Sequence, residues 1–180
     1  MRTFTYLCLL LTCMLISCTP AQEKHETDYT SYVNPFIGTD FTGNTYPGAQ
    51  APFGMVQLSP DNGLPGWDRI SGYFYPDSTI AGFSHTHLSG TGAGDLYDIS
   101  FMPVTLPYKE AEAPLGIHST FSHKDESAHA GYYQVRLTDY NINVELTATE
   151  RCGIQRYTFP EAQSAIFLNL KKAMNWDFTN

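Results

Sequence analysis

Short runs in which apolar and polar side chains alternate dominate the chain from residue 32 onward. In residues 142–148 every second side chain is apolar, and those between them are polar. An alternation of period two places the apolar side chains on one face of an extended strand, so this run predicts a half-buried strand. Residues 132–137 alternate in the same way, and their predicted inner face is Tyr133, Val135 and Leu137.

Four further runs predict strands at residues 55–58, 99–106, 153–159 and 164–170. The first is expected to stop at Pro60-Asp61-Asn62-Gly63, and Pro103 weakens the second as an interior strand. Asp139-Tyr140-Asn141 is typical of a hairpin connection. No stretch keeps a period of 3.6 over twelve residues, so helix is expected to be minor. Short strands at regular spacing predict a mainly β protein, an antiparallel β-sandwich.

Residues 171–180 carry neither a charged tail nor a pattern for a capping helix. A sheet that ended in this way would keep an unpaired edge. We therefore expect the sandwich to be incomplete at its C-terminal edge.

The first eighteen residues are predicted to be an export signal. Arg2 is followed by an apolar stretch over residues 4–16, which is shorter than the roughly 20 residues of a membrane-spanning helix. It ends in Leu15-Ile16-Ser17-Cys18, which resembles the lipobox of bacterial lipoproteins and predicts lipidation of Cys18. The alternative is an ordinary cleaved signal in which Cys18 is incidental. The polar residues 19–31 are expected to form a flexible tether, and 32–180 the folded domain of a lipoprotein in the periplasm or on the outer membrane or cell surface.

Composition limits the partners. The 180 residues suffice for one domain, and 10 basic against 18 acidic residues give a net charge of −8. Such a surface repels a phosphate backbone, so no nucleic-acid partner is expected. Cys8 and Cys13 leave with the signal, which makes Cys152 the remaining thiol beside Cys18, and its strand-like surroundings predict a buried structural thiol.

Trp67 and Asp68 form the first candidate binding site. They lie on a segment rich in Gly, where an indole face can pack on the apolar face of a sugar ring while a carboxylate accepts its hydroxyl hydrogens. The alternative is a loop tryptophan that packs into the core.

His85, His87 and Asp95 lie in a glycine-rich segment, residues 82–95, that is the second candidate. In an extended chain the two histidines point to the same side. They could ligate a metal, hydrogen-bond a substrate, or be buried polar groups with backbone partners, and no third metal ligand is evident. The glycines miss the spacing of a nucleotide-binding loop and instead suit a close approach of the backbone to a ligand or another domain.

Two carboxylate pairs, Glu110 with Glu112 and Asp125 with Glu126, invite an acid–base interpretation. Each lies in a polar stretch, and neighbours in sequence need not face one bond. Solvated surface positions are therefore expected, and no catalytic residue is assigned.

Taken together, many short words in chain order resemble the N-terminal domain of glycoside hydrolase family 92, the calcium-dependent α-mannosidases. The resemblance covers about residues 32–176. The words are Tyr32-Val33-Asn34-Pro35-Phe36-Ile37-Gly38-Thr39, Tyr46-Pro47-Gly48-Ala49, Pro52-Phe53-Gly54-Met55-Val56, Gly82-Phe83-Ser84-His85-Thr86-His87-Leu88-Ser89-Gly90-Thr91-Gly92, Met102-Pro103, Phe121-Ser122-His123-Lys124-Asp125-Glu126, Gly131-Tyr132-Tyr133, Glu145-Leu146-Thr147-Ala148-Thr149 and Arg156-Tyr157-Thr158-Phe159-Pro160.

The resemblance implies an N-terminal β-sandwich that packs on a C-terminal (α/α)6 barrel, with the active site between them. Members remove terminal α-mannose from glycans with inversion, using Ca²⁺ held mainly by the C-terminal domain, which also carries both catalytic carboxylates. Trp67, Asp68, His85, His87 and Asp95 are then the expected substrate contacts of this chain, and mannose-containing glycans and the C-terminal domain its partners.

Three functional hypotheses follow. The first is one part of an exported α-mannosidase that is inactive without its catalytic domain. The second is a lipoprotein that binds glycans without catalysis, and the third is a surface scaffold without a ligand.

Overall fold

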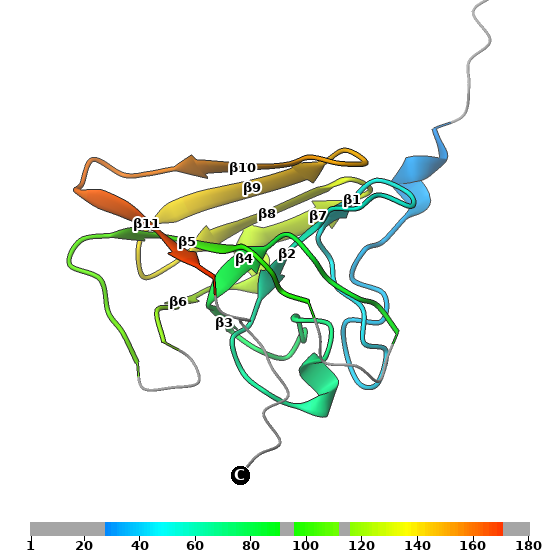
Figure 1. Ribbon diagram of the computed structural model, residues 1–180, viewed down its shortest axis with the longest axis horizontal. Helices are drawn as coiled ribbons and strands as arrows, with labels where there is room; N and C mark the ends of the chain where they lie inside the picture. Colours follow the sequence, from blue (N-terminus) through cyan, green and yellow to red (C-terminus); the bar gives the residue numbers. More distant parts are fainter. Residues whose placement is uncertain (1–27, 91–95, 112–115, 171–180) are drawn as a thin grey trace, which may run out of the picture.

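The computed structural model describes residues 28–90, 96–111 and 116–170, which form two antiparallel sheets and a small two-stranded ladder (Figure 1). One sheet has the order β1-β2-β4-β5-β11, the other β10-β9-β8-β7, and β3 pairs with β6. The strands are β1 (Ala49–Gln50), β2 (Gln57–Asp61), β3 (Thr79–Ile80), β4 (Gly82–Ser84), β5 (Ser100–Thr105), β6 (Ser119–Thr120), β7 (Glu126–His129), β8 (Tyr132–Leu137), β9 (Ile142–Ala148), β10 (Gly153–Thr158) and β11 (Ser164–Asn169).

Helix in these ranges consists of three 3-10 turns, η1 (Tyr29–Tyr32), η2 (Trp67–Arg69) and η3 (His123–Asp125). The predicted mainly β, antiparallel sandwich with little helix is therefore confirmed.

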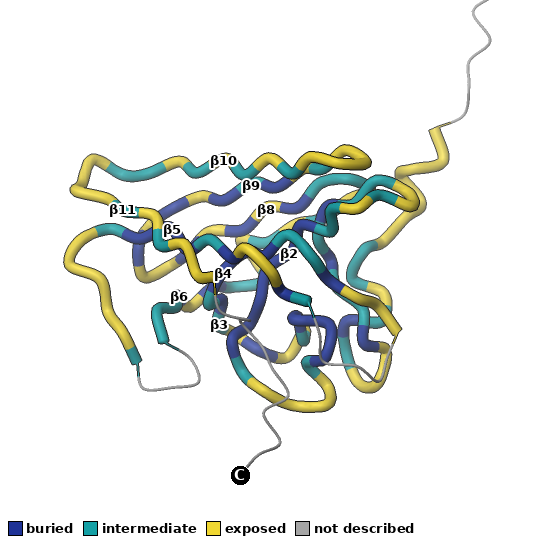
Figure 2. Tube along the Cα trace, in the orientation of Figure 1, coloured by how far each residue is buried: buried dark blue, intermediate teal, exposed yellow. Residues whose placement is uncertain are grey.

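The core depends on β8 and β9, whose predicted alternation is confirmed. Tyr133 pairs with Leu146, and Val135 with Val144, and all four side chains are buried. The first sheet covers this face with apolar side chains of its own, and both sets form one core cluster, dark blue in Figure 2. Each such side chain contributes about 1.5–3 kcal/mol when it leaves water. The members from the first sheet include Leu58, Phe83, Met102 and Val104.

The predicted end of β2 was wrong, because the strand continues through Pro60 to Asp61. Pro60 pairs with Phe83 of β4, but β1 pairs with β2 only at Gln57 and Leu58, so one edge of β2 has no strand partner beyond that point. A residue without an N–H is tolerated where a strand lacks a neighbour. Pro103 lies in β5 for a similar reason, since β4 pairs with β5 only through Phe101.

Cys152 is exposed, so its prediction as a buried thiol was wrong. β10 begins one residue later, and Cys152 belongs to the turn after β9, where its carbonyl accepts from the backbone N–H of Thr149. A turn residue does not share the burial of the strand that follows it.

The signal, Cys18, most of the tether and residues 171–180 lie outside the described ranges, so these predictions stay open. The last tether residues begin η1, which Asp28 caps through the backbone N–H of Thr30. Among the described residues, no helix is long and apolar enough to cross a membrane. β11 is an edge strand of its sheet.

Removal of a core side chain from β9 tests this packing. We expect Leu146→Ala to lower the free energy of unfolding by about 2–5 kcal/mol, because the side chain is fully buried. Asn143→Ala on the exposed face of the same strand is the control and should change it by less than about 0.5 kcal/mol. Urea unfolding measures both values, and equal costs would contradict the assigned faces.

Candidate functional site

The loop that precedes β3 carries Trp67 and Asp68 in η2. Trp67 is 55% exposed and Asp68 is exposed as well, so the alternative of a core tryptophan does not hold. Gly66 begins the turn at φ 149°, a backbone angle that favours glycine. The two residues proposed to contact a sugar are therefore both exposed at the surface.

The base of this loop is held firmly. Arg69 donates to both carboxylate oxygens of Asp77, from Nε at 2.6 Å and Nη2 at 2.5 Å, and lies 4.9 Å above the ring of Phe74. The hydroxyl of Tyr97 donates to the carbonyl of Ile70. These contacts anchor the residues directly after η2, so the exposed pair is presented from a fixed base.

A buried acid–histidine pair lies beneath the loop. The side chains of His87 and Asp61 are 0% and 1% exposed, and His87 Nε2 lies 2.9 Å from Asp61 Oδ1. His87 Nδ1 is 2.7 Å from the carbonyl oxygen of Gln57, which can only accept, so Nδ1 carries a hydrogen. A Cβ on Gly72 would lie 2.7 Å from Asp61 Oδ1, and at φ 88° this glycine lets the loop seat directly on the pair.

Both ring nitrogens of His87 are thus engaged, which matches the alternative of a buried polar group with partners. Sequence reasoning missed Asp61, because Pro60-Asp61-Asn62-Gly63 was interpreted as a turn. The strand instead continues through Pro60, and the Asp61 side chain meets His87, which follows β4.

His85 has different neighbours. β4 ends at Ser84 and His85 lies in a bend, so the extended geometry that would align the two histidines is absent at this point. His85 Nδ1 lies 2.9 Å from the carbonyl of Ile99, and its ring packs on the edge of Phe101 at 5.6 Å. The structure therefore associates His87 with the loop of Trp67 and Asp68 and directs His85 toward β5, while Asp95 lies outside the described residues.

The implied calcium finds no ligand set in this part of the chain. Over residues 28–90, 96–111 and 116–170, no three His, Cys, Asp or Glu side chains converge in a way that could hold a metal. Asp61 and Asp77 are already bound to His87 and Arg69. The described residues thus offer no cluster of acidic side chains for the ion.

Glu126 corrects the prediction of a solvated carboxylate pair. Its side chain is only 1% exposed, because pairing with Val135 places it on the inner face of β7. Its carboxylate accepts from the hydroxyls of Tyr133 at 2.6 Å and Tyr73 at 3.0 Å, and His123 Nδ1 lies 2.6 Å away. The sequence signal that could have predicted this burial is the alternation in β7, where Glu126 and Ala128 lie on the same face.

The other members of the two pairs differ. Asp125 and Glu110 are exposed, as expected, whereas Glu112 lies outside the described residues.

Comparisons with known proteins decide the family. Residues 32–180 match the model of the glycosyl hydrolase family 92 N-terminal domain. The chain belongs to this family.

Solved structures of family 92 share this fold. The α-mannosidase BT3965 from Bacteroides thetaiotaomicron is 45% identical with a TM-score of 0.75, over 79% of this chain and 20% of that one, both alone and in complex with mannoimidazole. The inverting mannosidase BT2199 from the same organism is 30% identical with a TM-score of 0.65, over 79% of this chain and 20% of that one.

Among curated proteins, an uncharacterized secreted glycosidase from Arthroderma benhamiae is 29% identical over 86% of this chain and 20% of its own length. This family 92 chain thus spans about a fifth of the relatives that it matches.

The ion pair at the base of the loop can be tested by a double-mutant cycle. Arg69→Ala should lower the free energy of unfolding by about 1–3 kcal/mol, since it leaves Asp77 nearly buried without its partner, and the 22% exposure of Arg69 limits the cost. Arg69→Ala with Asp77→Ala should cost less than the two single changes added together. Urea unfolding of the four proteins gives the coupling, and strict additivity would rule the ion pair out as an anchor.

The Glu126 cluster predicts a loss of stability at alkaline pH. Burial and the neighbouring carboxylate raise the pKa of both Tyr73 and Tyr133 in the folded state, compared with about 10 in the unfolded chain. Above pH 10 the unfolded chain releases protons that the folded chain retains, so the stability present below pH 10 declines by up to about 1.4 kcal/mol per pH unit for each group.

Tyr73→Phe removes one of these groups and should make the decline between pH 10 and pH 11 less steep. Tyrosines outside the Glu126 cluster contribute equally to both proteins. Urea unfolding at each pH measures the slopes, and an unchanged slope would contradict the raised pKa of Tyr73.

Proposed function

We propose that this chain is the N-terminal part of an exported family 92 α-mannosidase, and that the loop of Trp67 and Asp68 forms part of the wall of its mannose pocket. Two solved relatives that share the fold are named α-mannosidase or mannosidase, and one of them holds mannoimidazole. This chain spans about a fifth of each of these relatives, so the mannosidase activity of the whole protein is part of the proposal.

One observation carries the proposal, namely the exposed Trp67 and Asp68 on a loop with a fixed base. The face of an indole ring covers the apolar C–H groups of a pyranose, and a neighbouring carboxylate accepts its hydroxyl hydrogens. A site gains most when its contacts are held in place before the ligand arrives. Arg69, Asp77 and the buried His87 supply that support. His85 faces β5 and is not assigned to this pocket, whereas Asp95 is proposed at its margin.

The catalytic carboxylates are proposed to lie in the rest of the enzyme. Inverting hydrolysis needs one acid and one base about 6.5–9.5 Å apart with room for a water. Near Trp67, Asp77 is bound to Arg69 and Asp61 is bound to His87, which leaves Asp68 to face a sugar alone. We therefore expect no hydrolysis by this chain by itself, and we place the calcium ligands outside its described residues.

Export is proposed to end with a lipid on Cys18. The apolar stretch and the lipobox-like sequence support this proposal, and the relative from Arthroderma benhamiae is named a secreted glycosidase. The enzyme would then meet glycans in the periplasm or at the cell surface.

The proposal is tested on the purified chain with α-mannobiose and Ca²⁺. The chain has two tryptophans, so Trp67→Phe assigns the Trp67 indole N–H signal in an NMR spectrum. We expect α-mannobiose to shift that signal. Asp68→Ala should raise the dissociation constant obtained from the shift at least about threefold, because it removes a charge-assisted hydrogen bond. Thr147→Ala, on an exposed position of β9, is the matched control and should leave the shift unchanged.

Hydrolysis is followed in the same samples by release of free mannose. Release that co-purifies with the chain, or an indole signal that stays fixed at high mannobiose concentration, would contradict the proposal. Binding without any hydrolysis, by a chain shown to be complete in the cell, would favour the non-catalytic lipoprotein.

A further inference from the structure

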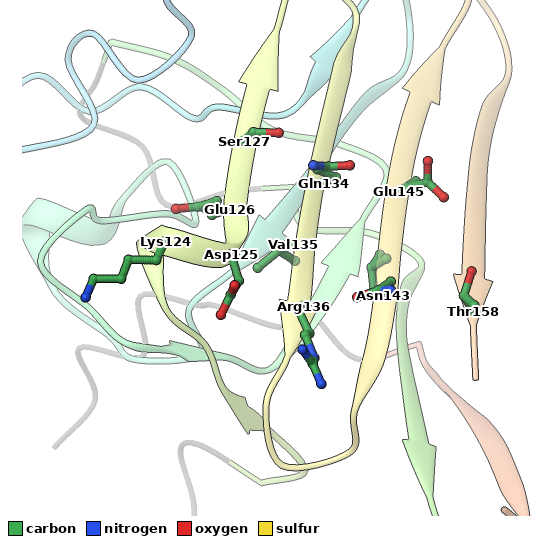
Figure 3. Close-up of a pocket in the computed structure, with 11 residues that line it drawn as sticks. Lys124, Asp125, Glu126, Ser127, Gln134, Val135, Arg136, Asn143, Glu145 and Thr158 are labelled. Atoms are coloured by element: carbon green, nitrogen blue, oxygen red, sulfur yellow. The ribbon is translucent and has the colours of Figure 1, made fainter. Parts of the chain in front are cut away.

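The outer face of β7, β8, β9 and β10 is hollowed. A cavity of about 530 Å³ opens on it, within the range of about 300–1,000 Å³ that is common for ligand sites. Figure 3 shows its lining residues on the four strands and in η3. The side chains that face away from the apolar core are Ser127, Gln134, Arg136, Asn143, Glu145 and Thr158, whereas Glu126 and Val135 belong to the inner face. The loop of Trp67 does not line this cavity.

The strand registers arrange the outward side chains in two rows. Neighbouring strands lie about 4.8 Å apart, so a row across three strands is about 10 Å long, longer than one hexose. In the first row, Ser127 pairs with Gln134 and Gln134 with Glu145. In the second, Arg136 pairs with Asn143 and Asn143 with Thr158.

Two of these groups are fixed before any ligand binds. The Glu145 carboxylate accepts from Arg156 and from the Tyr132 hydroxyl at 2.6 Å, and these donors lower its pKa, so it stays ionised. Arg136 donates to the side-chain carbonyl of Asn141 from Nε at 3.1 Å and from Nη2 at 2.5 Å. A carboxylate and a guanidinium each have further hydrogen-bonding positions beyond these contacts.

The chemistry of the cavity selects its ligand. Side-chain amides, hydroxyls, a carboxylate and a guanidinium dominate its outward side chains, which suits a ligand covered with hydroxyl groups. The lining has two cationic side chains, Lys124 and Arg136, and three acidic ones, Asp125, Glu126 and Glu145. Glu126 is buried against two tyrosines and Arg156 pairs with Glu145, so the field favours neither an anion nor a cation strongly. Asn143 makes no side-chain hydrogen bond to the described parts of the chain, so its amide is available to a ligand.

We propose that this outer groove binds a neutral oligosaccharide of several sugar units, at a site separate from the pocket of Trp67. The longer chain crosses the strands and meets both rows, whereas a single sugar meets only one. The groove then holds the glycan near the enzyme and takes no part in bond cleavage.

The test uses the full chain and an unbranched mannotetraose, followed by isothermal titration and by the amide signals of β8 and β9. We expect the tetrasaccharide to bind at least about tenfold more tightly than mannose. Gln134→Ala and Asn143→Ala should each weaken it at least about threefold, the effect of one lost hydrogen bond. The outer-face change Thr147→Ala, away from the groove, and Trp67→Ala should leave this binding unchanged.

Raising NaCl from 50 to 500 mM should leave the affinity within about twofold, since a neutral ligand is not screened. Absence of tetrasaccharide binding, or binding that Trp67→Ala abolishes and Asn143→Ala does not affect, would overturn the outer groove. The Trp67 indole signal tests the mannose pocket independently, so either proposal can fail while the other stands.

Discussion

The period-two alternation of β8 and β9 is the constraint on which the rest of the structure depends. It turns Tyr133, Val135, Val144 and Leu146 inward, and the same register fixes every outward side chain. A shift by one residue would exchange the two faces, burying Gln134 and Asn143 and exposing the core. The core and the outer groove are therefore two consequences of one register.

Buried polar groups add a second level of specificity. Glu126 is bound by two tyrosine hydroxyls and a histidine, and one oxygen of Asp61, Oδ1, lies against His87. An unpaired buried charge costs several kcal/mol of folding free energy. Removal of one partner would therefore destabilise the fold, because the other stays buried without it. These pairs tie β7 to the loop after η2, and β2 to the segment after β4, which fixes loops that apolar packing alone would leave adjustable.

The sequence was sufficient to predict the fold class and the strands with strong alternation. Burial of one face of a strand requires an apolar residue at every second position, and this pattern is visible in the sequence. It was insufficient for β1, β3, β4 and β6, which have two or three residues and too little length for a pattern. The continuation of β2 through Pro60 and the burial of Glu126 depend on the strands with which these residues pair. Such pairing joins residues distant in sequence and cannot be predicted from neighbouring residues alone. Trp67 and Asp68 were proposed from their residue types and are exposed, whereas Asp61 was hidden by a turn-like sequence.

The hydrogen bonds and ion pairs of the buried carboxylates support the proposal that the active site is shared between this chain and another part of the enzyme. A general acid or base must direct an oxygen at the substrate. Three acidic side chains that are nearly or fully buried in the described part of the chain face polar partners: Asp77 faces Arg69, Asp61 faces His87, and Glu126 faces two tyrosines. Their role is to hold loops and strands. Under the proposed function, a wall of this kind orients a sugar, and residues outside the described part of the chain supply the proton transfers.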